Sequence, residues 1–276
     1  MPFSAKRARF DEFYTIYDNI EKIYKSGYMK PTVFKDKIIY CNCDDYRWSN
    51  YVKFWKNNFE YFGIKKLIAT NYDIGDGAYI YTYDGHNETI EQGRDDGSFE
   101  HYADFINDDT IVVTNPPFSQ SRNYFNFLKN NDAKFYVHAS ILNVIKFWSD
   151  LNDIYFLYKG DYCLYELEGV KQFVAASGVV TNVVFDKTAS KVKLTKTFDE
   201  VKHDFYYEDD FYKGDKWKGR ILNVDWSNKI PYDYDDFMGV PISFICVQPW
   251  IRKQYKIYGP VIYGKKFYRL RIKKIK

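Results

Sequence analysis

The 276-residue sequence predicts an α/β fold with a mostly parallel sheet, followed by a β-rich or irregular C-terminal region. Short runs of β-branched and aromatic residues alternate with segments of helical periodicity over the first two thirds of the chain. Strands that alternate with helices form β-α-β units, whose strands are parallel and adjacent. The region after residue 186 instead carries many aromatic residues and frequent glycine and proline, without a long helical period.

The predicted elements follow from local patterns, taken in chain order. Buried strands are predicted at 37–41, 66–70, 110–114, 134–138, 153–158 and 179–185, with a hairpin between 75 and 85. Apolar residues recur at helical spacing from Trp48 to Phe62, and Gly63 marks the end of that helix. A second helix is predicted to run to about Lys129, with Ser119 or Ser121 as its N-cap. The segment 110–114 is the clearest strand, because it is short, β-branched and bounded by polar residues.

Charge is distributed unevenly along the chain. Residues 1–186 carry 20 Lys and Arg against 26 Asp and Glu, a net charge of −6, whereas residues 187–276 carry 20 against 11, a net charge of +9. A basic region of this size indicates contact with a polyanion such as nucleic acid, although a solvated surface of mixed charge is the alternative for any single lysine. The aromatic content of 21% excludes a disordered chain.

Several kinds of site and location are not expected. The four cysteines, Cys41, Cys43, Cys163 and Cys246, form no C-x-x-C pair, so we expect no metal site. No apolar run approaches the roughly 18 residues of a membrane span, and residues 1–7 lack the apolar core of a signal peptide. We therefore expect a cytoplasmic protein with reduced thiols and no membrane partner.

The tetrapeptide Asn115-Pro116-Pro117-Phe118 follows directly after the strand predicted at 110–114. Two prolines cannot continue a central strand, so the chain leaves the sheet there, at the carboxyl edge where α/β sheets bind ligands. Backbone carbonyls and the Asn115 side chain can then accept hydrogen bonds from an exocyclic amine such as adenine N6, and Phe118 can stack on the base. Acceptors on both N–H bonds make that nitrogen more nucleophilic, as transfer of a methyl cation requires. An ordinary Asn-Pro-Pro loop is the alternative.

Four stretches of the sequence together resemble one family, the EcoRI-type adenine-specific DNA methyltransferases. They read Tyr40-Cys41-Asn42-Cys43-Asp44-Asp45; Ser49-Asn50 through Phe59 to Gly63-Ile64-Lys65-Lys66-Leu67-Ile68-Ala69-Thr70; Val113-Thr114-Asn115-Pro116-Pro117-Phe118-Ser119; and Ile221-Leu222-Asn223 with Ile230-Pro231-Tyr232 and Met238-Gly239-Val240-Pro241-Ile242. The resemblance implies a class I S-adenosylmethionine-dependent methyltransferase fold, which is Rossmann-like. It also implies N6 methylation of an adenine in duplex DNA, with the base flipped out of the helix. The implied catalytic residues are Asn115, Pro116, Pro117 and Phe118.

The resemblance further implies S-adenosyl-L-methionine as the cofactor, and polar residues near the predicted strand ends are candidates to bind it. Carboxylates in such sites bind the ribose hydroxyls or the ammonium group, a role open to Asp44 and Asp45; capping of the helix that follows them is the alternative. Asp96 is a candidate to contact the adenine amine of the cofactor. The expected cofactor-binding residues are thus Cys41, Asn42, Asp44, Asp45 and Asp96.

One departure from the general pattern leaves alternatives open. Residues 42–45 stand where most class I methyltransferases have a Gly-x-Gly loop. Because that loop is missing, a catalytically silent nucleic-acid-binding protein on the same scaffold is one alternative. The other is a methyltransferase acting on RNA or on a protein amide, since related Asn-Pro-Pro motifs serve those substrates. The leading hypothesis is a monomer that binds double-stranded DNA, with 1–186 as the catalytic domain and 187–276 as a DNA-recognition region packed on it. A cognate restriction endonuclease, acting on the same site without direct contact, is a further expected partner in a bacterial or virus-infected cell.

Two segments of the basic region are candidates for DNA contact. Trp217 lies among Lys216, Lys218 and Arg220. In the segment 267–273, Tyr268, Leu270 and Ile272 alternate with Arg269, Arg271 and Lys273, so the three cations share one face of a strand. Contact with phosphates is one interpretation of that face. Protection of an exposed edge strand is the other.

Overall fold

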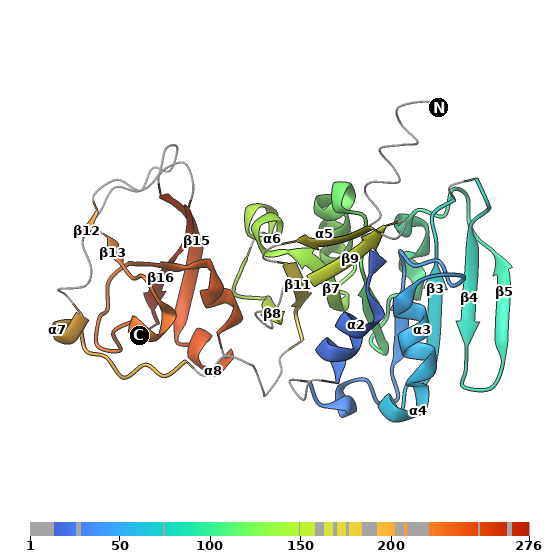
Figure 1. Ribbon diagram of the computed structural model, residues 1–276, viewed down its shortest axis with the longest axis horizontal. Coiled ribbons are helices and arrows are strands. Elements are labelled where there is room, and N and C mark those ends of the chain that lie inside the picture. The colour runs from blue at the N-terminus through green and yellow to red at the C-terminus, as the bar shows by residue number, and fades with distance from the viewer. Residues whose placement is uncertain are drawn as a thin grey trace. The chain divides into compact units, whose positions relative to one another are not determined.

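Figure 1 shows the computed structural model, which describes residues 14–25, 29–73, 75–148, 150–157, 163–167, 170–174, 177–183, 192–201, 207–208, 221–247, 249–263 and 267–275. The chain divides into two compact units. Unit 1 comprises Met1–Val144 and Leu157–Phe185, and unit 2 comprises Ile145–Phe156 and Asp186–Lys276. The segment 145–156 therefore belongs to the second unit, although the first unit resumes after it.

The largest sheet has eight strands in the order β5-β4-β3-β2-β6-β7-β11-β8. Their bounds in that order are Glu88–Gln92, Tyr79–Tyr83, Lys66–Thr70, Ile38–Cys41, Thr110–Thr114, Lys134–Ser140, Ser177–Thr181 and Tyr155–Leu157. The central strands β3, β2, β6 and β7 are parallel to one another. By contrast, β4, β5 and β11 pair antiparallel with their neighbours. The predicted α/β fold with a mostly parallel core is confirmed, and antiparallel strands extend it on both sides.

Most of the predicted strands of unit 1 are present. The strands at 66–70 and 110–114 have the predicted bounds, while β7 runs on to Ser140. The hairpin partner β5 was not predicted, because its sequence Glu-Thr-Ile-Glu-Gln is polar and every residue of it is exposed. The last strand, β11, begins two residues earlier than predicted, and residues 184–185 lie outside the described part of the chain.

The predicted helix at 48–62 is divided into two helices, α3 (Asn50–Asn57) and α4 (Phe59–Phe62). Asn58 interrupts it with φ −117°, and its side-chain amide donates a 2.8 Å hydrogen bond to the Phe54 carbonyl. An asparagine that binds the backbone four residues earlier competes with the next helical turn, which explains the interruption. The remaining helices of unit 1 are α2 (Tyr17–Tyr24), η1 (Pro31–Val33), η2 (Phe99–Phe105), η3 (Phe118–Gln120) and α5 (Ser121–Asn130), with α6 (Ile141–Phe147) leading into unit 2.

Helix α5 confirms the helix predicted after Phe118, but neither predicted serine caps it. The residue before the helix is Gln120, which makes no side-chain capping bond. Ser121 instead donates from its hydroxyl to the Phe118 carbonyl at 2.7 Å.

An aromatic cluster packs α3 against strands β2 and β3. Trp55 on α3 is fully buried, with ring centroids 4.8 Å from Phe34 and 5.0 Å from Phe62. Tyr24 of α2 lies 5.1 Å from the same indole, edge to face. Each such pair stabilises the fold by about 0.5–1.5 kcal/mol beyond the burial of its area. This packing fixes the direction of α3, whose first turn begins at the candidate site.

Unit 2 contains a five-stranded sheet in the order β12-β13-β14-β16-β15 (Figure 1). The strands span Tyr207–Glu208, Ile221–Asn223, Met238–Pro241, Phe267–Lys274 and Tyr255–Tyr263, in that order. The short elements of this unit are α7 (Phe198–Val201), η4 (Ser227–Lys229), η5 (Ile242–Cys246) and α8 (Pro249–Arg252). A three-stranded sheet of unit 1, β1-β9-β10, joins Tyr14–Thr15, Cys163–Leu167 and Val170–Val174. The prediction of a β-rich C-terminal region is confirmed.

The alternation predicted along strand 267–273 is present in β16. Leu270 and Ile272 are fully buried, while Arg269, Arg271 and Lys273 are half-buried. However, β16 lies between β14 and β15, so the interpretation of these charges as protection of an edge strand is wrong. Across the described residues, no helix is both long and apolar enough to cross a membrane.

The buried guanidinium of Arg252 holds the segment 145–156 against the C-terminal part of unit 2 through hydrogen bonds to backbone carbonyls. It donates to the carbonyls of Leu151 at 2.7 Å and Asn152 at 3.3 Å, and also to that of Ile154. The ring of Tyr155 lies 4.7 Å from the guanidinium carbon. Burial lowers the pKa of Arg252 to about 10, so the side chain still carries its charge at neutral pH. These bonds make the segment a structural part of unit 2.

We expect Arg252→Met to lower the free energy of unfolding by about 3 kcal/mol or more, because several buried carbonyls lose their donor at once. Urea denaturation followed by far-UV circular dichroism measures the change. Lys253→Met is the matched control, since Lys253 is the exposed neighbour in sequence. Equal unfolding midpoints for the two variants would contradict this account of Arg252.

Candidate active site

The candidate site lies where the strand order of the large sheet reverses. From β2 the chain proceeds to β3 on one side, whereas β6 and β7 lie on the other side. Strands β2 and β6 are parallel neighbours, with Ile38 opposite Thr110 and Tyr40 opposite Val112. Their carboxyl ends are therefore adjacent, and ligands of open α/β sheets bind at such a switch point. The segments 42–45 and 115–118, predicted separately as sites, follow these two strand ends.

A cavity of about 500 Å³ opens at this switch point, entirely within unit 1. Its volume falls in the range of small-molecule sites, roughly 300–1,000 Å³. Residues from five places along the chain line it: Thr15 of β1; Asn42, Asp44, Asp45 and Ser49 around the start of α3; Asn71 and Tyr72 after β3; Gly97, Ser98, Phe99 and Glu100; and Asn115, Pro117, Ser119 and Gln120. The structure thus brings the predicted residues Asn42, Asp44, Asp45, Asn115 and Pro117 to one cavity.

The carboxylate of Asp44 joins several walls of this cavity. Oδ1 accepts a 2.6 Å hydrogen bond from the Ser49 hydroxyl, and Oδ2 accepts a 2.5 Å bond from the Thr114 hydroxyl. The backbone N–H of Asn115 also donates to the carboxylate. The backbone N–H of Asp44 itself donates to the Thr70 carbonyl at 3.0 Å. One residue therefore connects the ends of β2, β3 and β6 with the start of α3.

Burial raises the pKa of Asp44 from 3.8 to about 6, and the hydrogen bonds from Ser49, Thr114 and Asn115 act in the opposite direction. Burial disfavours the charged form, whereas donors to the carboxylate favour it. At neutral pH the cavity wall therefore carries a negative charge, which favours a cationic ligand.

Asp45 points to a different partner, the guanidinium of Arg47. Arg47 Nε donates to Asp45 Oδ1 at 2.9 Å, and its Nη2 donates to Oδ2 at 2.6 Å. The guanidinium lies 4.4 Å from the Trp48 ring and 5.1 Å from the Tyr79 ring. The N-cap of α3 is Ser49, whose hydroxyl accepts from the N–H groups of its first turn. Capping of this helix by Asp44 or Asp45, the alternative considered from the sequence, is therefore wrong.

Asn42 lies in the loop after β2 and is held by the helix that follows the Asn-Pro-Pro segment. Its Oδ1 accepts a hydrogen bond from the hydroxyl of Tyr124 on α5. Its Nδ2 is buried and finds no hydrogen-bond acceptor among the residues that the structure describes. A buried amide N–H without an acceptor is rare in folded proteins and costs about 1–3 kcal/mol. A bound ligand with an acceptor would remove that cost.

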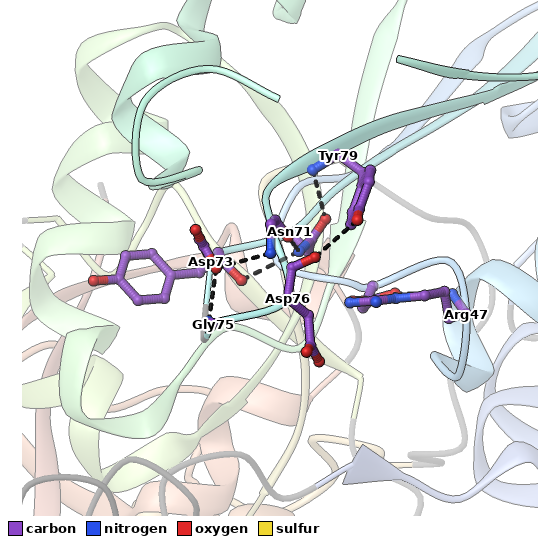
Figure 2. Close-up of polar contacts among 9 residues, drawn as sticks. Arg47, Asn71, Asp73, Gly75, Asp76 and Tyr79 are labelled. Carbon is purple, nitrogen blue, oxygen red and sulfur yellow. Dashed lines mark hydrogen bonds and ion pairs between the residues drawn. The ribbon is translucent and has the colours of Figure 1, made fainter. Parts of the chain in front are cut away.

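Polar contacts fix the loop after β3 that forms another wall (Figure 2). Asn71 Oδ1 accepts from the Tyr79 N–H at 2.9 Å, and Asn71 Nδ2 donates to the Gly77 carbonyl at 3.0 Å. Asp73 Oδ1 accepts from the N–H groups of Gly75 and Gly77 at 2.7 and 2.9 Å. Both side chains are thus occupied within the loop. Tyr72 lies between them, is 53% exposed and lines the cavity.

Close backbone contact fixes the neighbouring loop, which contains Asp96. Gly97 has φ +75°, and a Cβ there would lie 2.2 Å from the Asn71 carbonyl oxygen, so only glycine fits. The Asp96 carboxylate accepts from the Ser98 N–H at 3.0 Å and lies 3.2 Å from His101 Nε2. These donors lower its pKa, the Ser98 backbone most of all. Residues 97–100 line the cavity, whereas Asp96 faces His101 beside it.

The other predicted residues lie around the cavity rather than on its lining. Cys41 is fully buried in the hydrophobic core, and burial raises the pKa of its thiol. Pro116 is buried, and Phe118 is half-buried at the start of η3. Sequence reasoning did not identify Thr15, Ser49, Thr114 or Tyr124. Only Thr114 carried a usable signal, as the polar residue that ends a buried strand directly before the tetrapeptide.

The cations of β16 are engaged within unit 2. Arg269 donates from Nη1 to the Val224 carbonyl at 2.6 Å and from Nη2 to Asp225 at 3.2 Å. Lys273 lies 3.6 Å from Asp236 and 4.9 Å from the ring of Phe237. Trp217, Lys216, Lys218 and Arg220 lie outside the described residues. In the described part of the chain, no group of three or more His, Cys, Asp or Glu side chains is placed to hold a metal ion.

Comparisons with known proteins bear on this geometry. The model of a family described as adenine-specific methyltransferase EcoRI matches residues 3–93 and 82–266. The chain is 30% identical to the type II methyltransferase M.EcoRI of Escherichia coli, over 87% of this chain and 83% of that protein. It is 29% identical to M.MgeORF184P of Mycoplasma genitalium, over 92% and 84%, and 26% identical to M.MpnI of Mycoplasma pneumoniae, over 92% and 83%. No solved structure matches the chain.

The raised pKa of Asp44 predicts a specific dependence of stability on pH. The folded protein binds the Asp44 proton more tightly than the unfolded chain, so this contribution is complete below pH 3.8 and is lost as the pH rises through about 6. We expect the free energy of unfolding of the wild type to fall by about 2–3 kcal/mol more than that of Asp44→Asn between pH 4 and pH 7.

Urea denaturation of both proteins across this pH range measures the difference. Asp44→Asn is expected to fold, because an amide can accept from Ser49 while it donates to the Thr114 hydroxyl oxygen. Parallel stability curves for the two proteins would show that Asp44 does not titrate in this range.

Proposed function

Because the chain belongs to the EcoRI family of adenine-specific methyltransferases, we propose that the cavity at the β2–β6 switch point is where it transfers a methyl group to adenine N6 in duplex DNA. The observation that carries the proposal is that Asn115 and Pro117 of the Asn-Pro-Pro segment line the same cavity as the loop after β2. One segment has acceptors for an amine, and the other presents a buried carboxylate and an amide donor. The alternatives of an RNA or protein-amide substrate, or of a catalytically silent protein, gain no support from relatives named type II methyltransferases.

Asn115 and the two prolines would hold the target amine. Pro117 has φ −53°, and proline rings restrict φ to this region, so the backbone at the cavity is stiff. The Asn115 side chain and the carbonyls of Asn115 and Pro116 would accept from the two N6 hydrogens, which directs the nitrogen lone pair out of the ring plane. Phe118 would offer an aromatic face to the base. The target adenine must leave the DNA stack to reach the cavity.

S-adenosyl-L-methionine would supply an electrophilic methyl group on a sulfonium. The amine nitrogen would form the new N–C bond as the C–S bond breaks, a neutral thioether would be left, and one N6 proton would go to water. The residues present fit such a ligand. Asn42 Nδ2, which has no acceptor within the described part of the chain, would donate to a polar atom of the cofactor. Asp44 places a negative charge where a cationic ligand is expected, and Tyr72 offers a ring for stacking on a heterocycle. Cys41 would support the cavity from the hydrophobic core. The loop that contains Asp96 would form one wall of the cavity.

We propose that Asp45 acts through Arg47 instead of binding the cofactor directly. Its two oxygens accept hydrogen bonds from the Arg47 backbone N–H, Nε and Nη2. A carboxylate has about four lone-pair sites, so little capacity is left for a ligand. The pair would keep Arg47 flat against Trp48 at the edge of the cavity.

Unit 2 would contribute the contacts to DNA, with its net positive charge attracting the phosphates. The relatives are named type II methyltransferases. For this chain, a restriction endonuclease of the same site would be the functional partner, without direct contact. We propose that the protein is a cytoplasmic monomer.

Asn115→Ala tests the catalytic assignment. We expect transfer of tritium from labelled S-adenosylmethionine to duplex DNA to fall about 100-fold or more, because the amine loses an acceptor that acts in the transition state. Affinity for S-adenosylhomocysteine, measured by calorimetry, should change less than about threefold. Asn126→Ala, at an exposed position of α5, is the control and should keep wild-type activity.

Full activity of Asn115→Ala would refute the assignment of the site. A wild-type protein that binds S-adenosylhomocysteine and methylates RNA, but no DNA of any sequence, would refute the substrate.

Tyr72→Ala tests the stacking contact with the cofactor. We expect the affinity for S-adenosylhomocysteine to fall about tenfold, since stacking on an aromatic ring contributes roughly 1–3 kcal/mol. Tyr72→Phe should bind normally, because the ring is retained. Tyr61→Ala is the matched control, as Tyr61 is 57% exposed on α4 and does not line the cavity. Equal affinities of the Tyr72→Ala and Tyr61→Ala proteins would exclude this contact.

A further inference from the structure

Thr114, the last residue of β6, makes a contact that the proposed function does not yet use. It is fully buried, and its hydroxyl donates to Asp44 Oδ2 at 2.5 Å. Valine has almost the same shape but no hydroxyl, so at this position it would leave the buried Asp44 carboxylate without one of its donors. The hydroxyl therefore contributes a polar contact to a residue of the cavity wall as well as filling space.

The same carboxylate accepts from the next residue along the chain. The backbone N–H of Asn115 donates to Asp44, beside the bond from Thr114. Proline has no N–H group, so Asn115 supplies the one backbone donor of the segment 115–117. The chain is thus held by Asp44, in the loop after β2, where it passes from β6 into the Asn-Pro-Pro segment.

We propose that Thr114 and Asp44 are positioning residues for methyl transfer, in which Asp44 holds the backbone of Asn115 and Thr114 holds the Asp44 carboxylate in place. The inference rests on the proposed function of Asn115. Beyond that function, it states that two residues align the acceptors of Asn115: Thr114 orients the Asp44 carboxylate, and that carboxylate binds the Asn115 backbone. We call this pair of contacts the relay. A small displacement of an aligned group lowers the rate of a transfer reaction strongly, because the reacting atoms must meet in line.

The relay depends on the ionised form of Asp44, since a protonated carboxyl would have to use one oxygen as a donor. Of the titratable groups that act on it, Asp45 is a like charge and is itself paired with Arg47. The others are Cys41, Tyr24 and Tyr124, whose pKa values burial raises, so they are neutral at pH 7. Loss of the Thr114 hydroxyl removes one of the bonds that lower the pKa of Asp44. The pKa of Asp44 should therefore rise further in Thr114→Val.

Thr114→Val is the test, because it removes the hydroxyl and keeps the shape. We expect kcat for methylation of duplex DNA at pH 7 to fall at least tenfold, with KM for S-adenosylmethionine changed less than threefold. The acidic limb of the kcat profile, near pH 6 in the wild type, should move to higher pH. Thr114→Ser, which retains the hydroxyl, should restore both kcat and the position of the limb.

Thr110→Val provides the matched control on the same strand. Thr110 is also fully buried, and its hydroxyl donates to the Phe105 carbonyl at 2.8 Å, remote from Asp44. This variant should lose stability and keep kcat and the pH profile. The proposal is overturned if Thr114→Val keeps the wild-type kcat and limb, or if Thr110→Val changes both to the same extent. An active Asn115→Ala protein would overturn both the proposed function and the positioning role of Thr114 and Asp44. An inactive Asn115→Ala protein together with a fully active Thr114→Val protein would overturn the positioning role alone.

Discussion

The buried carboxylate of Asp44 connects three strand ends and one helix start, and the arrangement of the cavity depends on it. Its backbone reaches β3 through Thr70, and its side chain reaches α3 through Ser49 and β6 through Thr114. Burial of a carboxylate is unfavourable unless donors surround it, and here two hydroxyls and one amide do so. The consequence is a fixed relation between two loops that are about seventy residues apart in sequence.

The surroundings of Asp44 explain how the fold tolerates this charge. The aromatic cluster around Trp55 packs α3 against the sheet. This packing holds the Ser49 hydroxyl, at the start of α3, within hydrogen-bond distance of Asp44. The large content of aromatic residues in the sequence thus has a structural use in unit 1. A rigid core allows a polar cavity to keep its shape while it is empty, which reduces the loss of entropy when a ligand binds.

The sequence predicts the fold of unit 1 well and the contacts of the site poorly. The strands 66–70 and 110–114 were predicted with the correct bounds, because β-branched residues between polar ends leave little ambiguity. Strand β5 was not predicted, because an exposed polar strand shows no alternation of apolar and polar residues. The helix break at Asn58 was not predicted either, because it depends on a single side-chain hydrogen bond. The position of Asn115 at the sheet edge followed from topology. The partners of Asp44 and Asp45 did not, because adjacent carboxylates in one loop give no indication of which one turns inward.

Unit 2 is assembled from two separate stretches of the chain, and Arg252 joins them. This has a consequence for how the unit can be exchanged between relatives. Suppose that recombination or engineering transfers only the C-terminal stretch to a relative. Arg252 would then arrive without the carbonyls of segment 145–156 that it binds, and that segment would lose its donor. Unit 2 is therefore discontinuous in sequence, and a chimaera that keeps the Arg252 contacts must exchange residues 145–156 together with the C-terminal stretch.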